Sequence, residues 1–301
     1  MAIRFKHRVE YGLLRAVSAL VCVLPYRAAL ALGAGLAWIA FHVVRFRVGE
    51  AVRRIRSVLG EGVGKREARR IAWISLRNLF FNGIEILRFP RMTKAWVTRY
   101  VDATGMAFIE AHWNRASGAI LAVPHMGNWD LAGVGSSLMG LPVFFLARRQ
   151  KNPLVDAYLN RLRGATGALT IHTDSGALRQ IIRHLKAGKI FALLPDVRAR
   201  GSGVSVPFLG GQAVLATGME SFARHAGVPI FPACALREGW ARHCWIVRAP
   251  VLPDPSVDRE SDQQRIMCEV IARFDEFVRA HPEQYFWYNK RWILDPIHQK
   301  R

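Results

Sequence analysis

Motifs that would place this sequence among disulfide-bonded, zinc-binding or dinucleotide-binding proteins are missing. Its four cysteines form no C-x-x-C pair and no zinc-ligand spacing: they are Cys22, Cys234, Cys244 and Cys268. Such cysteines are typical of free thiols in a reducing compartment. No G-x-S-x-G elbow and no complete G-x-G-x-x-G loop occurs, so the sequence indicates neither a serine hydrolase nor a dinucleotide site. We predict no metal site and no bound cofactor.

Acidic residues are also scarce. The chain has 22 Asp and Glu against 43 Lys and Arg, which gives a formal net charge of +21. An excess of this size predicts an anionic partner, which could be nucleic acid, an acidic membrane surface or a phosphorylated substrate. The basic residues are scattered and form no nucleic-acid recognition module, so nucleic acid is the partner that we do not expect.

One long apolar stretch, residues 12–44, is broken only by Arg15, Pro25 and Arg27 and has basic residues on both sides. Its longest uncharged piece, 28–44, is near the minimum of roughly 17 residues for a spanning helix. The stretch predicts either one tilted span or a kinked pair of half-buried helices that bends at Pro25. A cleaved signal peptide, with "ALA" at 29–31, and a soluble pair of core helices are the alternatives. We assign residues 1–50 to an N-terminal hydrophobic membrane-anchoring segment and residues 51–301 to the catalytic domain.

Residues 45–100 predict helices with a basic surface, and beyond residue 100 short apolar runs alternate with helical patterns. This alternation predicts an α/β fold with a mixed, partly parallel sheet flanked by helices. The predicted strands are 118–123, 142–147, 168–172, 189–194, 228–233 and 244–249. The predicted helices are 130–139, 153–164, 175–187, 213–226 and 260–280.

The stretch "ILAVPHMGNWDLAG", residues 120–133, places His125 just past a buried strand and Asp130 near the start of the next helix. Ligands of open α/β sheets bind at such strand ends. Across this corner the Asp130 carboxylate could accept a hydrogen bond from one imidazole nitrogen and leave the other nitrogen as a general base. The alternative is a helix cap beside a packed histidine. Because no side-chain nucleophile accompanies the pair, we expect the substrate's own hydroxyl to attack, with backbone N–H groups of Gly127 and Asn128 as the oxyanion donors.

The segment "PHMGNWD" resembles the H-x-x-x-x-D/E motif of the glycerolipid acyltransferase superfamily. Within it, the sequence is most similar to the bacterial lipid A biosynthesis acyltransferases (lauroyl and myristoyl transferases), a family that includes the mycobacterial phosphatidylinositol mannoside acyltransferases. The similarity extends over about residues 10–295. Three further segments carry it, through Arg148, Asn152, Pro153, Arg163 and Gly167, then Asp196, Val206, Pro207, Phe208 and Gly210, and finally Trp287 and Arg291 of "PEQYFWYNKRW".

This resemblance implies a membrane-associated acyltransferase. It would transfer a fatty acyl chain from acyl carrier protein or coenzyme A to a hydroxyl of a lipid A precursor or related glycolipid, in lipopolysaccharide biosynthesis. It implies His125 and Asp130 as catalytic residues. It also implies a set of substrate-binding residues: Asn128, Arg148, Arg163, Asp196 and Gly210.

From the residues themselves, the arginines suit phosphate recognition, and Asp196 suits a salt bridge to one of them. The aromatic C-terminus suits a core that also anchors at a membrane interface through Lys290 and Arg291.

Further expectations concern location and alternatives. The family resemblance implies the inner, cytoplasmic membrane, with the active site on its cytoplasmic face and an anionic membrane lipid as a partner. Two departures from the family pattern stand out: Asp130 replaces the common Glu, and a second acidic residue after Asp196 is either replaced by Arg198 or lost. A lysophospholipid or other glycolipid acyltransferase, or a non-catalytic membrane scaffold of the same fold, are the alternative functions.

Overall fold

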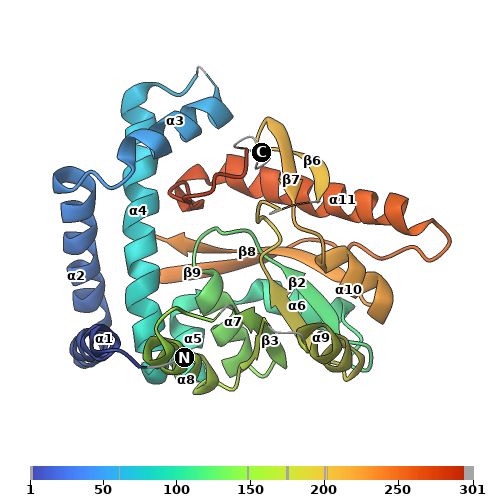
Figure 1. The fold of residues 1–301 in the computed structure, drawn as a ribbon, viewed down its shortest axis with the longest axis horizontal. Helices are drawn as coiled ribbons and strands as arrows, with labels where there is room; N and C mark the ends of the chain where they lie inside the picture. Colours follow the sequence, from blue (N-terminus) through green and yellow to red (C-terminus); the bar gives the residue numbers. More distant parts are fainter. Residues whose placement is uncertain are drawn as a thin grey trace.

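A seven-stranded sheet with the order β1-β9-β8-β2-β5-β3-β4 forms the centre of the fold (Figure 1). The computed structural model describes residues 3–60, 62–147, 149–173, 176–199, 201 and 203–294. The strands of this sheet are β1 (Val101–Asp102), β2 (Ala119–Ala122), β3 (Val143–Ala147), β4 (Leu169–His172), β5 (Ile190–Leu193), β8 (Ile230–Glu238) and β9 (Arg242–Val247). A separate antiparallel hairpin joins β6 (Val204–Phe208) to β7 (Gly211–Leu215).

Strand β2 is the middle of the sheet, and all four of its residues are buried. It pairs in parallel with β5 on one side and with β8 on the other. Only β8 and β9 are antiparallel among the paired strands of this sheet. The carboxyl ends of β2 and β5 therefore lie side by side, which is where an open α/β sheet places a ligand site. These observations confirm the predicted α/β fold with a mixed, partly parallel sheet flanked by helices, and most of the strand pairs are parallel.

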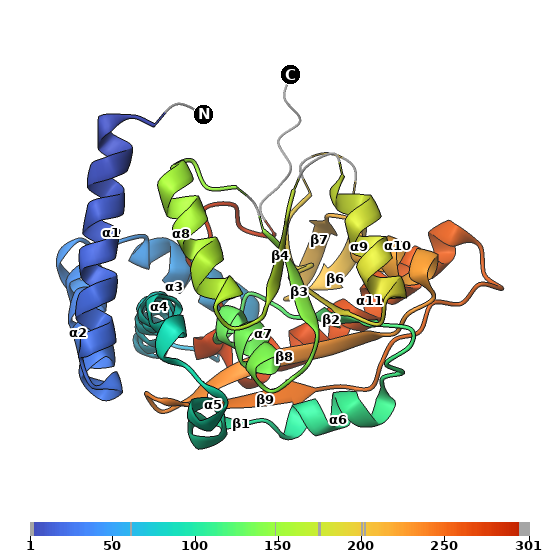
Figure 2. The same ribbon diagram turned by 90° about the horizontal axis from the view of Figure 1, so that it is seen from below.

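Helices cover both faces of the sheet (Figure 2). The α-helices are α1 (Phe5–Val23), α2 (Tyr26–Trp38), α3 (Val48–Leu59), α4 (Lys65–Arg88), α5 (Lys94–Tyr100), α6 (Thr104–His112), α7 (Trp129–Leu138), α8 (Pro153–Gly164), α9 (Ala177–Lys186), α10 (Met219–Ala226) and α11 (Arg259–Ala280). Shorter helical turns are η1 (Ile39–Val43), η2 (Phe89–Arg91) and η3 (Pro282–Gln284). Apolar residues of α6 and α7 pack on one face of the sheet, and those of α9, α10 and α11 pack on the other.

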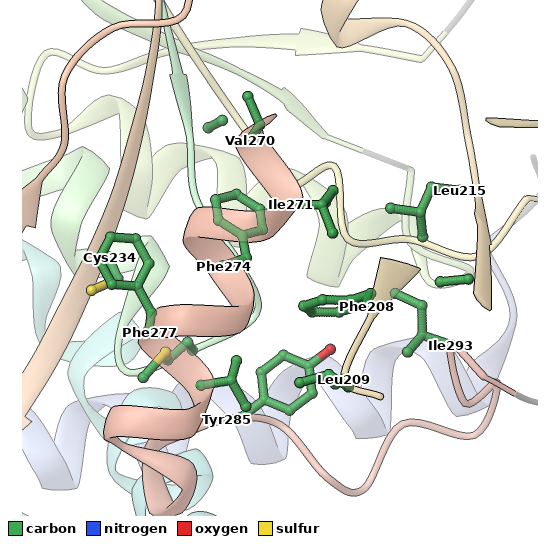
Figure 3. Close-up of a cluster of buried hydrophobic side chains, with 14 of the residues drawn as sticks. Phe208, Leu209, Leu215, Cys234, Val270, Ile271, Phe274, Phe277, Tyr285 and Ile293 are labelled. Atoms are coloured by element: carbon green, nitrogen blue, oxygen red, sulfur yellow. The ribbon is translucent and has the colours of Figure 1, made fainter. Parts of the chain in front are cut away.

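Part of the largest core joins α11, the β6–β7 hairpin and the C-terminal segment (Figure 3). Ile271 and Phe274 of α11 are fully buried there, and Phe208 of the hairpin meets the ring of Tyr285 edge to face. Trp287 is 0% exposed and Tyr288 is 2% exposed. The aromatic C-terminus is therefore core, and its expected role as an interface anchor is wrong for these rings.

The N-terminal segment forms two helices that meet at Pro25, as a kinked pair would. Proline lacks the N–H that would continue α1, so the chain turns there and α2 starts at Tyr26. Both helices pack against α4, with Val21 and Leu30 fully buried in a cluster that includes Leu131 of α7. By length and composition alone, Tyr26–Val43 could cross a membrane.

The sequence predicted the strands β2, β3, β4, β5, β8 and β9 and the helices α7, α8, α9 and α11 to within a few residues, apart from the far end of β8. The predicted helix 213–226 was wrong over its first part, because residues 213–215 belong to β7 and α10 begins only at Met219. The hairpin turn Leu209–Gly210 explains the difference. Both residues have positive φ, 53° and 79°, as a tight two-residue hairpin turn requires.

Replacing Ile271 by Ala should lower the free energy of unfolding by about 2–5 kcal/mol, because the truncated side chain leaves a cavity in the core. Leu252→Ala is the control, since Leu252 is 59% exposed and a surface change of this kind stays within about 0.5 kcal/mol. Denaturant titration in detergent measures both. Equal losses at the two positions would contradict the packing described here.

Candidate active site

His125 meets Asp196 at the carboxyl edge of the sheet. The register of β2 on β5 pairs Ala122 with Leu193, and each strand then continues for three residues to His125 and Asp196. The imidazole Nδ1 lies 2.8 Å from Asp196 Oδ1, and the backbone N–H of His125 donates to Oδ2 at 2.8 Å. The carboxylate is fully buried, whereas the His125 side chain is 27% exposed.

This contact defines which imidazole nitrogen can act as a base. A carboxylate only accepts hydrogen bonds, so Nδ1 of His125 carries the proton. No hydrogen bond to Nε2 is made by any residue within the described ranges, and Nε2 is therefore available to a substrate. Burial disfavours the charged ring, but the charge and hydrogen bond of Asp196, with the charge of Asp130, outweigh it and raise the pKa of His125 above its usual value.

Tyr285 lies next to Asp196, the acidic partner of His125. Its ring is 4% exposed. Burial raises the pKa of the Tyr285 hydroxyl well above its usual value, and the charge and hydrogen bonding of Asp196 add to this. The phenol therefore stays neutral and can donate to the carboxylate. Asp196 thus accepts from the backbone and the ring of His125, and the neutral phenol of Tyr285 lies beside it.

Asp130, which the sequence paired with the imidazole, has a different partner. Its Oδ1 accepts from the guanidinium of Arg163 at 3.0 and 3.2 Å, and both side chains are 20% exposed. The hydrogen bond that we expected between His125 and Asp130 is therefore not made, and that prediction is wrong. Asp130 lies in the first turn of α7, close enough for its charge to act on His125, and it fixes Arg163 at the edge of the site.

The turn that follows His125 is held rigidly by backbone hydrogen bonds. The N–H of Gly127 donates to Gln284 O at 2.9 Å, and the N–H of Asn128 donates to Ala235 O at 3.1 Å. Neither group is available as an oxyanion donor, which corrects the expectation for them. Gly127 has φ +57°, and a Cβ there would overlap the carbonyl of Ala235, so the turn requires glycine.

The C-terminal segment forms the second wall of this turn. The N–H of Phe286 donates to His125 O at 3.0 Å, and Met126 forms a β-bridge with Tyr285. The Gln284 side chain pairs with the backbone of Arg237 through bonds of 3.0 and 3.1 Å. The "PEQYFW" part of the sequence therefore positions the histidine by adding a short strand-like edge.

A buried polar cluster around Glu85 of α4 anchors the turn from the other side. Asn128, 1% exposed, caps α7 by accepting from the Leu131 N–H at 3.0 Å and donates its amide to Glu85. Both ends of its amide are occupied, so Asn128 is structural rather than substrate-binding. Asn82 donates to Gly127 O at 2.6 Å, and Arg237 joins Asn82 at 2.9 Å to Glu85 at 2.8 Å.

Electrostatics keep this cluster charged. Burial disfavours the carboxylate of Glu85, but the buried guanidinium of Arg237 outweighs it and holds the pKa of Glu85 well below its usual range. His243 also reaches Glu85, at 3.2 Å. Burial lowers the pKa of His243 despite that carboxylate, so its ring is neutral at pH 7. A buried Glu–Arg pair is stable only when its geometry and hydrogen bonds are complete.

The remaining predicted substrate-binding residues are Gly210 and Arg148. Gly210 is the second residue of the β6–β7 turn and owes its place to its positive φ; its contact with substrate stays a prediction. Arg148 lies outside the described residues. No group of three or more His, Cys, Asp or Glu side chains is placed to hold a metal ion in the described part of the chain.

The fold is an open α/β sheet with a His–Asp pair at its edge, and among the described residues no Ser, Thr or Cys side chain is hydrogen-bonded to that pair. The family model of bacterial lipid A biosynthesis acyltransferases matches residues 2–293, and the chain belongs to this family. It is an acyltransferase.

Named relatives include a phosphatidylinositol mannoside acyltransferase of Mycobacterium tuberculosis, 23% identical over 72% of this chain and 68% of the relative. The corresponding protein of Mycolicibacterium smegmatis is 23% identical, over 72% and 70%. A lipid A biosynthesis acyltransferase of Haemophilus influenzae is 24% identical, over 65% and 60%.

The partnership of Asp196 with His125 was missed from the sequence, although its signal was present. Both residues come directly after short apolar runs that end in Val-Pro or Leu-Pro. If the two runs had been paired as neighbouring parallel strands, their carboxyl ends would have brought the two side chains together. The Glu85 cluster carried no such signal, because its members are far apart in sequence.

Asp196→Asn should move the acid limb of the kcat/KM profile to lower pH and reduce the rate. The raised pKa of His125 predicts a wild-type limb above the ordinary value of about 6.5. Without the charge of Asp196, burial lowers that pKa, and the lost orientation of the base costs about 10²–10⁴ in rate. Asp130→Asn keeps the acceptor of Nδ1 and should move the limb less. A larger shift for Asp130→Asn would contradict the assignment.

Glu85→Gln should destabilise the protein by about 3–5 kcal/mol at pH 7, because Arg237 is left as an uncompensated buried charge. The free energy of unfolding from denaturant titration measures this loss. Glu67→Gln is the control, since Glu67 pairs with Arg70 at the surface and its loss should leave the midpoint unchanged. If Glu85→Gln were as stable as this control, the cluster would not anchor the turn.

Proposed function

We propose that this protein transfers a fatty acyl chain from a thioester donor to a hydroxyl of an anionic glycolipid at a membrane surface. The observation that carries the proposal is the His125–Asp196 pair, with Nε2 open to a ligand at the carboxyl edge of the sheet. A base without a neighbouring protein nucleophile suits direct attack by the acceptor's hydroxyl. The family match and the lipid-acylating names of the relatives support the same reaction.

In the proposed reaction, Nε2 of His125 takes the proton of the acceptor hydroxyl as its oxygen attacks the thioester carbonyl. The imidazolium that forms is stabilised by the carboxylate of Asp196. When the tetrahedral intermediate collapses, the carbon–sulfur bond breaks and the thiolate takes the proton from His125. The products are an ester and a free thiol, and no acyl-enzyme forms.

Arg163 is the group that we assign to a phosphate of the acceptor. Its guanidinium is partly exposed beside the His125–Asp196 pair and is oriented by Asp130. Arginine held in one geometry suits bidentate contact with phosphate oxygens. The first two N–H groups of α7, those of Trp129 and Asp130, have no acceptor within the helix, and they replace Gly127 and Asn128 as the oxyanion donors that we propose.

Membrane association is proposed from the N-terminal apolar face, the exposed apolar side chains of α1, α2 and η1. Its members are Phe5, Val9, Leu13, Val17, Leu20, Val23, Leu32, Leu36, Trp38, Ile39 and Val43. Contiguous exposure on this scale is unusual for a soluble surface. Exposed Arg4, Lys6, Arg8, Arg27 and Arg45 lie along the same helices and their ends, where they suit anionic headgroups at an inner, cytoplasmic membrane surface.

The relatives bear on the acceptor. Those from the two mycobacteria are named for a phosphatidylinositol mannoside and the one from Haemophilus for lipid A. Each of these two acceptors is a phosphorylated lipid that carries sugar hydroxyls. We therefore propose a hydroxyl of an anionic glycolipid, of the lipid A precursor type or the mannoside type.

The direct test measures transfer of a radiolabelled acyl chain in detergent from acyl carrier protein or coenzyme A to lipid A precursors, mannosides and lysophospholipids. Wild-type protein should acylate one glycolipid, and His125→Ala should lose about 10²–10⁴ of that rate. His112→Ala, an exposed histidine of α6, is the control. Folded wild-type protein that transferred to none of these acceptors would favour a scaffold, and acylation of lysophospholipid alone would reassign the acceptor.

Ile39→Glu combined with Val43→Glu should weaken binding to anionic vesicles by more than about tenfold, because each methylene kept in water costs about 0.8 kcal/mol. Vesicle flotation measures the bound fraction. The control combines Leu178→Glu with Leu252→Glu, two leucines that are each 59% exposed outside the N-terminal apolar face. Similar losses in both double variants would show that the N-terminal apolar face does not contact the membrane.

A further inference from the structure

A groove of about 1000 Å³ lies between α9 and α10, and the proposed reaction does not use it. Leu178, Ile182 and Phe222 supply its apolar lining. Apart from Phe222 these side chains lie on α9, whose opposite face is buried against the sheet through Ile181 and Leu185. The groove is therefore an outer surface with its own lining and does not open into the core.

The rim of the groove is basic, and most of its cations form no ion pair with any described residue. Arg179, Arg183, Lys186 and Arg259 line it, and none of the four forms an ion pair in the part of the chain that the structure describes. Arg224 also lines the groove but is bound to Asp262. No acidic side chain is among the described lining residues. Four unpaired cations around an apolar surface are complementary to an anionic partner with apolar side chains.

The location of the groove favours a protein over a membrane. The N-terminal apolar face lies at one end of the molecule, and α9 and α10 lie toward the other end in both views (Figures 1 and 2). A flat bilayer in contact with α1 and α2 would not also cover this groove. A concave surface between two helices instead fits the ridge of a third helix, about 10 Å across.

We propose that this groove docks the acidic carrier protein that delivers the acyl thioester. The partner would place a helix in the groove, with apolar side chains against Ile182 and Phe222 and carboxylates against the arginines. This inference rests on the proposed acyl transfer and names its donor as a carrier protein rather than a free coenzyme.

The groove lies close enough to the His125–Asp196 pair for a carrier bound there to deliver an acyl chain to it. Helix α9 begins just after β4 ends, at the same edge of the sheet as His125. Strands β2 and β4 are separated by β5 and β3, so their carboxyl ends are about 14 Å apart at about 4.8 Å per strand. A carrier could bind where the groove reaches the start of α9. Its flexible phosphopantetheine arm would then have to cross this distance to reach Nε2 of His125.

The first experiment measures binding of fluorescently labelled acyl carrier protein by anisotropy at low and high salt. Arg179→Glu combined with Arg183→Glu should weaken binding by at least about tenfold and reduce its salt dependence. Lys65→Glu combined with Arg66→Glu, two exposed residues at the start of α4, makes the same charge change as a control. Thermal unfolding of both variants checks that they are folded.

The second readout is the rate of transfer from two donors. The groove variant should raise KM for acyl carrier protein by at least about tenfold and leave kcat/KM for acyl-pantetheine, which has no protein partner, unchanged. Equal carrier affinity in the groove and control variants would overturn the proposal, as would a groove variant that lost vesicle binding or self-association instead. If wild-type protein bound the carrier through the groove but transferred from neither donor, docking would stand and the proposed function would fail.

Discussion

The pairing of β2 with β5 is the constraint on which the rest of the site depends. It sets the two strand ends level, so that His125 and Asp196 meet three residues beyond the register pair of Ala122 and Leu193. A slip of one strand by one residue would turn every side chain to the other face. The position of the base is therefore fixed by the centre of the sheet, where all four residues of β2 are buried.

A second constraint is the rigidity of the turn after His125. Three parts of the chain hold it: α4 through Asn82 and Glu85, β8 through the carbonyl of Ala235, and the C-terminal segment through Gln284. General acid–base catalysis needs the ring within hydrogen-bond reach of the hydroxyl, and a turn fixed on three sides keeps it there. The buried Glu85–Arg237 pair stabilises this arrangement, because its hydrogen-bond partners are the residues that shape the turn.

The sequence predicted the fold class and most strands, because hydrophobic patterning and local turn signals are enough for them. It also singled out His125, Asp130, Arg163 and Asp196 as site residues. It paired the histidine with the wrong carboxylate, because Asp130 is near in sequence while Asp196 is 71 positions away. Strand order is set by long-range packing, which local pattern does not encode.

The same limit explains the other corrections. Gly127 and Asn128 looked like free donors, but their N–H groups bond to Gln284 and Ala235, which lie more than 100 residues further along the chain. The composition of the aromatic C-terminus suited both a core and an interface anchor, and the packing against α11 and the β6–β7 hairpin shows that Trp287 is core. Composition indicates what a segment can contact, whereas tertiary structure decides what it does contact.

Asp196 holds His125 with a proton on Nδ1 and leaves Nε2 open to the substrate. Nitrogen NMR of ¹⁵N-histidine-labelled protein, with His125 assigned from the spectrum of His125→Gln, tests it most directly. We expect the neutral ring of His125 to carry its proton on Nδ1 and to titrate above the ordinary value of about 6.5. A neutral ring protonated on Nε2, or a titration below that value, would contradict it.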